Sequence, residues 1–104
     1  MSTDKEIQEN FEILRKIQKK PHSTQRQMAE ELGVSLGKLN YCLKALKEKG
    51  LIKIENFKKN PSKLNYFYIL TPKGITEKTK LTLRFMKRKL KEYDELKKDL
   101  SNES

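Results

Sequence analysis

Apolar residues recur every three or four positions near the start of the chain, between residues 3 and 20. This spacing predicts a helix with one apolar face, because a helical turn takes about 3.6 residues. Thr3 is placed to cap the start of this helix, with Glu6 three residues later, and Pro21 ends it. The expected core face consists of Ile7, Phe11, Leu14 and Ile17. We expect this helix to pack behind the elements that follow it.

Two shorter helical patterns come next and are separated by a glycine. Thr24 and Gln27 have the spacing of a capping box, and Gly33 predicts the end of the first helix because glycine adopts the left-handed cap conformation without a steric cost. Ser35 is placed to cap the second helix, and Gly50 closes it. The second helix carries leucines at helical spacing: Leu36, Leu39, Leu43 and Leu46. Two short helices joined by a tight turn predict a helix-turn-helix.

The apolar period changes after Gly50. Residues 51–57 alternate in part, and residues 64–70 are rich in β-forming side chains, so both segments predict strands. The six residues between them, KKNPSK, have the composition of a turn. A hairpin directly after a helix-turn-helix is a wing. The predicted fold class is therefore α+β, mainly α: a winged helix-turn-helix domain over residues 1–74, with three helices and a β-hairpin.

The last helical pattern is the longest, from about residue 75 to residue 100, and a short tail at residues 101–104 is expected to fray. Leu81 and Phe85 form a small stripe that we expect to pack on the winged helix. The more distal apolar residues extend beyond so small a domain, so they predict dimerisation through this helix. A helix that folds back over its own domain is the alternative. The expected dimerisation residues are Leu83, Met86, Leu90, Tyr93 and Leu100.

The charge of the chain is strongly positive and unevenly spread. Its formal net charge is +10 over 104 residues. Residues 1–34 hold six basic and six acidic side chains, whereas residues 35–91 hold sixteen basic and three acidic ones. Residues 92–104 hold two basic and five acidic side chains. The positive charge therefore begins at the second helix of the helix-turn-helix, which is the distribution expected of a nucleic-acid surface.

The face of the second helix opposite its leucines carries a small residue, an amide and several cations, including Lys47. A small residue allows close approach of the backbone, an amide pairs with base edges, and cations bind phosphates. An ordinary solvated helix face is the alternative. The helical residues that we expect at DNA are Thr24, Gln25, Ser35, Gly37, Lys38, Asn40, Tyr41 and Lys44. Those expected from the wing are Lys58, Lys59, Asn60 and Lys63.

Several classes of function have no support in the residues. With one histidine, His22, and one cysteine, Cys42, the chain cannot assemble a metal site of the usual ligands, so no metal and no cofactor is expected. No acid, base and nucleophile set is visible, so an enzyme is not expected either. Cys42 is expected to be a small buried residue; a thiol switch whose pKa is lowered by neighbouring lysines is the alternative. The absence of an apolar leader or membrane-length segment predicts a cytoplasmic protein with no membrane partner.

Three segments together resemble the compact MarR-type winged-helix regulators associated with exopolysaccharide gene clusters: QRQMAEELGVSLGKLNYCLKALKEKGLIKIENF, YFYILTPKGI and RFMKRKLKEYDELK. The resemblance extends from about Ile13 to Leu100. It implies a cytoplasmic transcription factor that binds operator DNA as a homodimer. It also implies that the wing contacts come from residues 58–63, and that the groove contacts come from Ser35, Lys38, Asn40, Tyr41 and Lys44.

The leading hypothesis is a sequence-specific, double-stranded DNA-binding transcriptional regulator that acts as a homodimer on a pseudo-palindromic operator. Two alternatives stay open: a winged-helix protein–protein docking module, and a nonspecific or architectural nucleic-acid binder. The positive charge concentrated on the second helix, wing and final helix favours the first hypothesis, because a docking surface does not require it. A small-molecule effector is left open.

Overall fold

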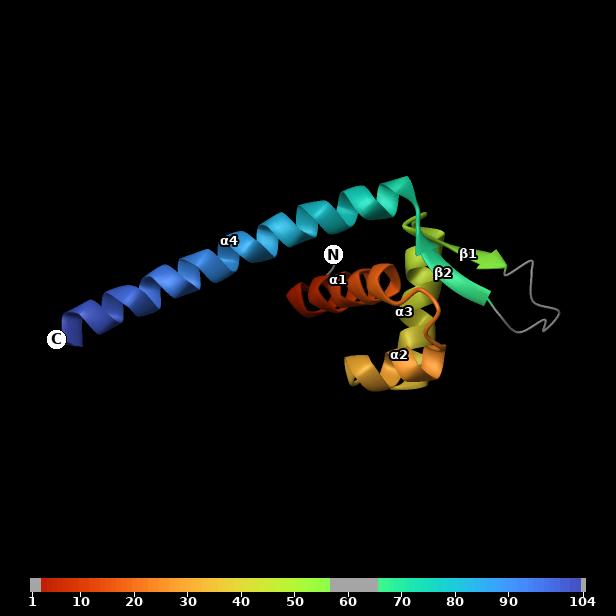
Figure 1. The fold of residues 1–104 in the computed structure, drawn as a ribbon, viewed down its shortest axis with the longest axis horizontal. Helices are drawn as coiled ribbons and strands as arrows, with labels where there is room; N and C mark the ends of the chain where they lie inside the picture. Colours follow the sequence, from red (N-terminus) through yellow and green to blue (C-terminus); the bar gives the residue numbers. More distant parts are fainter. Residues whose placement is uncertain (1–2, 57–65, 104) are drawn as a thin grey trace.

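A computed structural model describes residues 3–56 and 66–103 of the chain, and Figure 1 shows the arrangement of its elements. The elements follow the order α1, α2, α3, β1, β2, α4. The structure is thus a helical domain with one hairpin and a long final helix, as predicted. The expected wing contacts Lys58, Lys59, Asn60 and Lys63 lie outside the described residues.

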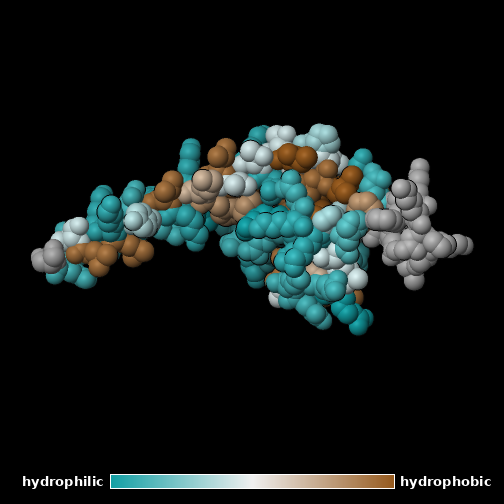
Figure 2. Space-filling model, viewed as in Figure 1, coloured by the Kyte–Doolittle hydropathy of each residue, from teal (hydrophilic) through white to brown (hydrophobic). Residues whose placement is uncertain are grey.

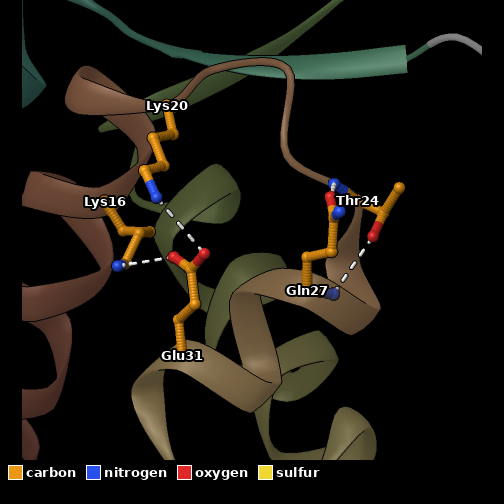
Figure 3. Close-up of polar contacts among 5 residues, drawn as sticks. All are labelled: Lys16, Lys20, Thr24, Gln27 and Glu31. Carbon is orange, nitrogen blue, oxygen red and sulfur yellow. Dashed lines mark hydrogen bonds and ion pairs between the residues drawn. The ribbon is translucent and has the colours of Figure 1, made fainter.

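The three helices of the domain begin at the predicted caps. In α1 (Asp4–Lys19), the N–H of Glu6 donates to Thr3 Oγ1 at 3.1 Å. In α2 (Gln25–Leu32), the predicted capping box between Thr24 and Gln27 is formed in both directions, each hydrogen bond being 3.0 Å long (Figure 3). Ser35 caps α3 (Leu36–Glu48) in the same way. Local sequence therefore determines where each helix starts.

Glycine conformation ends α2 as predicted. Gly33 has φ +70° and ψ +30°, and its N–H donates to the carbonyl oxygens of Ala29 and Glu30. A side chain at this left-handed position would be strained. The turn into α3 therefore depends on glycine.

The two strands, β1 (Ile52–Asn56) and β2 (Tyr66–Leu70), pair antiparallel. Ile52 lies opposite Leu70, and Ile54 lies opposite Tyr68. The predicted hairpin is confirmed at its base. In Figure 1 it projects from the domain on the side away from α4.

The core lies where α1, α2, α3 and the base of the hairpin meet. Its fully buried side chains include the predicted residues Leu14, Ile17, Leu39, Leu43 and Leu46. Leu36 differs from the prediction, since it is 40% exposed. It is the first residue of α3 and lies at the edge of the leucine stripe rather than in its centre.

Helix α4 (Pro72–Glu103) is longer than predicted at both ends. The sequence predicts a start near residue 75 and a winged-helix boundary at residue 74, because Pro72 and Gly74 resemble a break. Proline is in fact well suited to a first helical turn, and Thr71 precedes it as a cap: the N–H of Gly74 donates to Thr71 Oγ1 at 3.0 Å. At the other end, residues 101–103 are helical, where a frayed tail was expected.

The start of α4 is fastened to the end of α3. Thr71 donates from its N–H to the Leu51 carbonyl oxygen and from its hydroxyl to the Gly50 carbonyl oxygen. Lys73 Nζ donates to the Lys49 carbonyl oxygen at 2.9 Å. Gly74 packs so tightly here that an added Cβ would lie 1.9 Å from the Leu51 carbonyl oxygen. We call these contacts the α3–α4 joint.

Helix α4 passes along α1 and then leaves the domain. Its first half packs as predicted: Leu81 is buried, and the Phe85 and Phe11 rings lie 4.9 Å apart between centroids. Its second half projects beyond the other elements, giving the molecule dimensions of 65 × 27 × 26 Å (Figure 1). Figure 2 shows apolar side chains spaced along this projecting helix. The alternative in which the helix folds back over its own domain is not what the structure shows.

Candidate DNA interface

The outer face of α3 is fully available to solvent. Leu39, Leu43 and Leu46 anchor the helix in the core, which turns its opposite side outward. Tyr41 is 75% exposed, although tyrosine is usually partly covered by its neighbours. The predicted contacts Gly37, Asn40, Tyr41 and Lys44 are all exposed, as is Lys47. The structure therefore brings an amide, a phenol and two ammonium groups onto one helix.

Gly37 leaves open space on this face. Apart from its chain neighbours and the backbone of its own helix, no described atom lies within 4 Å of the position that a Cβ would occupy there. The fold itself therefore does not require glycine at this position. A glycine near the start of an exposed helix does allow another backbone to approach closely.

Lys38 is directed toward α1, unlike the other predicted contacts of α3. Its Nζ lies 3.4 Å from Glu9 Oε2, and the side chain lines the same depression as Cys42. The periodicity of α3 alone did not reveal this partner, because Glu9 lies on a different helix. In the free protein Lys38 links α1 to α3.

The predicted contacts at the helix starts have structural partners. The hydroxyls of Thr24 and Ser35 accept N–H groups as caps. Gln25 Nε2 donates to Tyr68 Oη at 3.1 Å, which ties the start of α2 to β2. Of these residues, Gln25 links the helix-turn-helix to the hairpin. Arg26, exposed in the first turn of α2, was not among the predicted contacts, although its neighbours Gln25 and Thr24 were.

An ion-pair cluster fixes α2 against α1 (Figure 3). The two carboxylate oxygens of Glu31 lie 2.7 Å from Lys16 Nζ and 3.3 Å from Lys20 Nζ. Hydrogen bonds from Lys16 and then Lys20 lower the pKa of Glu31 below its usual 4.5. We call this group the Glu31 clip. It is partly exposed, so its contribution to stability is modest and sensitive to salt.

Cys42 is buried, as sequence analysis expected. Burial raises the pKa of its thiol, and the nearby Lys38 offsets this only in part. The alternative of a thiol switch with a lysine-lowered pKa is therefore wrong in direction. A buried, protonated thiol is an unreactive core residue.

The described residues form neither a cluster of metal ligands nor a membrane-spanning helix. No group of three or more His, Cys, Asp or Glu side chains in residues 3–56 and 66–103 is placed to hold a metal ion. Within the same ranges, no helix is both long and apolar enough to cross a membrane.

Comparison with known proteins agrees with this geometry. Residues 10–53 match a protein-family model described as a winged helix-turn-helix DNA-binding domain. No curated protein sequence matches the chain.

Three solved structures with a similar fold come from bacteria of three genera. Staphylococcus aureus MarR, in complex with salicylate and kanamycin, has 28% identity and a TM-score of 0.67, over 83% of this chain and 56% of that one. Streptococcus pneumoniae FabT, in complex with DNA, has 26% identity and a TM-score of 0.63, over 90% and 61% respectively. ZitR of Lactococcus lactis, a zinc-responsive MarR family member, has 25% identity and a TM-score of 0.62, over 92% and 62%.

The fold and the family model together define a winged helix-turn-helix domain. With the long final helix included, the chain has the fold of MarR-type winged-helix regulators, as the resemblance in its sequence implied. The chain spans 56% to 62% of the length of these three structures. The association with exopolysaccharide gene clusters stays a prediction.

Proposed function

We propose that this protein is a cytoplasmic transcription regulator, not an enzyme, which binds a specific double-stranded DNA site as a homodimer. The observation that carries the proposal is the outer face of α3, where an amide, a phenol and cations stand free of the core. The family model, which describes a DNA-binding domain, supports the same conclusion. So does the similarity to FabT, whose structure contains DNA.

In this proposal α3 enters the major groove. Asn40 pairs with an adenine edge, because a side-chain amide matches the donor and acceptor of that base. Gly37 lets the helix approach the DNA backbone, and Lys44 binds a phosphate. Tyr41 adds a phosphate hydrogen bond or an apolar contact with a base. Ser35 places the start of α3 against another phosphate, which the helix dipole favours.

The wing adds contacts outside the groove that α3 occupies. We propose that Lys58, Lys59 and Lys63 bind phosphates and that Asn60 donates a hydrogen bond. These residues lie in the segment between β1 and β2, beyond the described part of the chain. The proposal for them therefore rests on their sequence and on the position of the hairpin.

Two copies joined through α4 would present two α3 helices to the DNA. A two-fold symmetric protein binds a pseudo-palindromic site, with half-sites about one helical turn apart. The exposed apolar residues of α4 support this arrangement, since Leu83, Met86 and Leu90 are each more than half exposed in one copy. Tyr93 and Leu100 continue the same strip.

Selection of bound duplexes from a random DNA pool, with the purified full chain at moderate salt, tests the proposal. Recovery of a two-fold symmetric motif is the expected result. Salt-sensitive retention without any motif would replace it with a nonspecific or architectural binder. No retention of DNA at low salt would leave the docking module as the better explanation.

A further inference from the structure

An apolar strip on α4 is left uncovered by the domain. Its six residues are 54% to 70% exposed, although each is large and apolar: Leu83, Met86, Leu90, Tyr93, Leu96 and Leu100. Within residues 3–56 and 66–103, nothing packs over this strip. A continuous exposed apolar surface of this kind marks an interaction site. Leu96 was not among the predicted dimerisation residues, although it follows Tyr93 at helical spacing.

The strip has an internal symmetry that indicates how a second helix would lie on it. Positions 83, 86, 90, 93, 97 and 100 of α4 are spaced 3-4-3-4-3, which reads the same in both directions about a point between Lys91 and Glu92. Reversing the helix about this point places Leu83 opposite Leu100, and Leu90 opposite Tyr93. The same operation places Met86 opposite Lys97, whose aliphatic stem can cover it. Four of the six strip residues therefore face another strip residue, while Met86 and Leu96 face the lysines Lys97 and Lys87.

The charge along α4 changes sign at the same point. Residues 78–91 hold seven basic side chains and no acidic one, whereas residues 92–103 hold five acidic and two basic ones. An antiparallel pair sets the basic half of each helix against the acidic half of the other. A parallel pair would set like charges together along the whole helix. Because close like charges repel and unlike charges attract, only the antiparallel pair is complementary.

The groove beside the strip gives the acidic half a place to bind. Helices α1 and α4 enclose about 880 Å³ whose lining includes the apolar Phe11, Phe85 and Met86. Four cations and one carboxylate, Glu12, also line it; the cations are Arg15 and Lys19 from α1, and Lys78 and Lys89 from α4. In the antiparallel register, the acidic C-terminal turns of α4 from a second copy lie beside the N-terminal part of α4 that lines this groove.

We propose that two copies of this chain pair their α4 helices antiparallel, with the two-fold axis between Lys91 and Glu92. The acidic half of each helix then lies against the basic half and the α1–α4 groove of its partner. The inference rests on the homodimer proposed above and adds its orientation, register and charge pattern. The partner that fits this surface is thus a second copy of this chain.

Cysteine cross-linking tests the register directly. In a Cys42→Ala background, Leu83→Cys and Leu100→Cys proteins are oxidised separately and then as a mixture. The antiparallel register brings residue 83 of one copy to residue 100 of the other, so only the mixture should form the disulfide dimer. Two copies of residue 83 would lie about 25 Å apart, since they are separated by seventeen levels of a helix rising about 1.5 Å per residue. Efficient homodisulfides in each separate protein would overturn the proposal.

Charge reversal tests the electrostatic part. Lys87 and Lys89 flank the strip; reversal about the axis sets Lys89 level with Asp94 of the second copy, and Lys87 one level from its Glu95. Lys87→Glu/Lys89→Glu should weaken dimerisation at least tenfold, and so should Glu92→Lys/Asp94→Lys. An equimolar mixture of the two should recover the wild-type dimer affinity, because it restores unlike charges at both ends.

The matched control is Arg88→Glu, which also reverses a positive charge in the basic half but lies on the side of the helix opposite the strip. It should change dimerisation by less than threefold. Dimers that tolerate both double variants would overturn the proposed charge pattern.

Sedimentation and DNA selection on the wild-type protein separate the two proposals. A dimer that selects a symmetric motif but forms homodisulfides refutes the register alone. A monomer at all concentrations refutes the proposed homodimer as well.

Discussion

At the scale of single residues, the outer face of α3 carries residues that the fold itself does not require and that the proposed DNA binding would require. Gly37 is the clearest case, because the space around it is open in the free protein. We expect Gly37→Ala to leave the thermal midpoint unchanged or to raise it, since alanine favours a helix by about 0.5–1 kcal/mol over glycine. The same change should weaken DNA binding by crowding the approaching backbone. Thermal unfolding and fluorescence anisotropy measure the two effects.

A gain in stability with unchanged DNA affinity would contradict the role of Gly37. Lys47→Ala is a suitable control on the same helix. It should also leave the fold intact, but it should lower affinity through the loss of one charge.

Asn40 should contribute to binding of the selected duplex alone, whereas Lys44 should contribute to binding of any duplex. Asn40→Ala is expected to cost about 1–3 kcal/mol on the selected duplex and little on random DNA, because it removes a contact with a base. Lys44→Ala should weaken binding to both and reduce the salt slope by about one, because it removes a contact with a phosphate. Titrations of both duplexes at several salt concentrations measure this. Equal losses on the two duplexes for Asn40→Ala would refute its role as a base reader.

Sequence periodicity located the exposed face of α3 but not the partners of its edge residues. The outward positions follow from leucine spacing, which is local information. Lys38 instead meets Glu9, and Gln25 meets Tyr68, across elements far apart in the chain. Such contacts depend on how the helices pack, and a helical pattern carries no information about that.

At the scale of elements, the α3–α4 joint is the most demanding contact in the fold. A side chain at Gly74 would overlap the Leu51 carbonyl oxygen. We expect Gly74→Ala to lower the free energy of unfolding by about 2 kcal/mol or more, because backbone atoms must move to admit it. Urea unfolding monitored by circular dichroism measures this loss. Gly37→Ala is the matched control, since it makes the same substitution in open space; equal stabilities of the two variants would contradict the close packing.

The Glu31 clip predicts a dependence of stability on pH. Lys16 and Lys20 lower the pKa of Glu31 in the folded protein, so the ionised carboxylate stabilises the fold above the usual pKa of 4.5. This contribution is lost as the pH falls through the lowered pKa. Glu31→Gln should therefore be less stable than wild type at pH 7, and the difference should vanish in acid. Urea titrations from pH 7 to pH 3 test this, and a constant difference would contradict it.

Caps and turn residues made the element boundaries of the domain predictable from sequence. The start of α4 was not predictable in this way. Thr3, Thr24 and Ser35 each satisfy an N–H group three residues ahead, so short-range spacing reveals them. Pro72 and Gly74 resemble helix breakers in sequence. In the structure Pro72 occupies the first helical position, and Gly74 is needed for contact with Leu51. The need for glycine at position 74 becomes clear only from its contact with the Leu51 carbonyl group, which the sequence does not reveal.

At the scale of the whole molecule, the proposed dimer would make stability depend on protein concentration. A dimer stabilises its folded subunits by mass action, so the thermal midpoint of the wild-type protein should rise with protein concentration. Leu90→Glu should abolish this dependence, because it places a charge in the centre of the proposed interface. Leu90 is 60% exposed in a single copy, so the substitution should leave the domain folded.

Thermal scans at protein concentrations a hundredfold apart, together with sedimentation, check this prediction. Lys98→Glu is a control that also places a negative charge on the distal half, off the apolar strip. A wild-type midpoint that does not vary with concentration would contradict dimerisation in that range.

The α3–α4 joint has a mechanical consequence for the assembled molecule. Helix α4 has 32 residues and so extends about 48 Å, which makes it a lever arm anchored at the end of α3. A rotation of only about 5° at the joint displaces the far end by about 4 Å, comparable to the rise of one base pair along a DNA strand. The carbonyl hydrogen bonds of Thr71 and Lys73, and the glycine between α4 and Leu51, resist that rotation. In the proposed dimer, a stiff joint would thus keep the two α3 helices in phase with successive turns of the duplex.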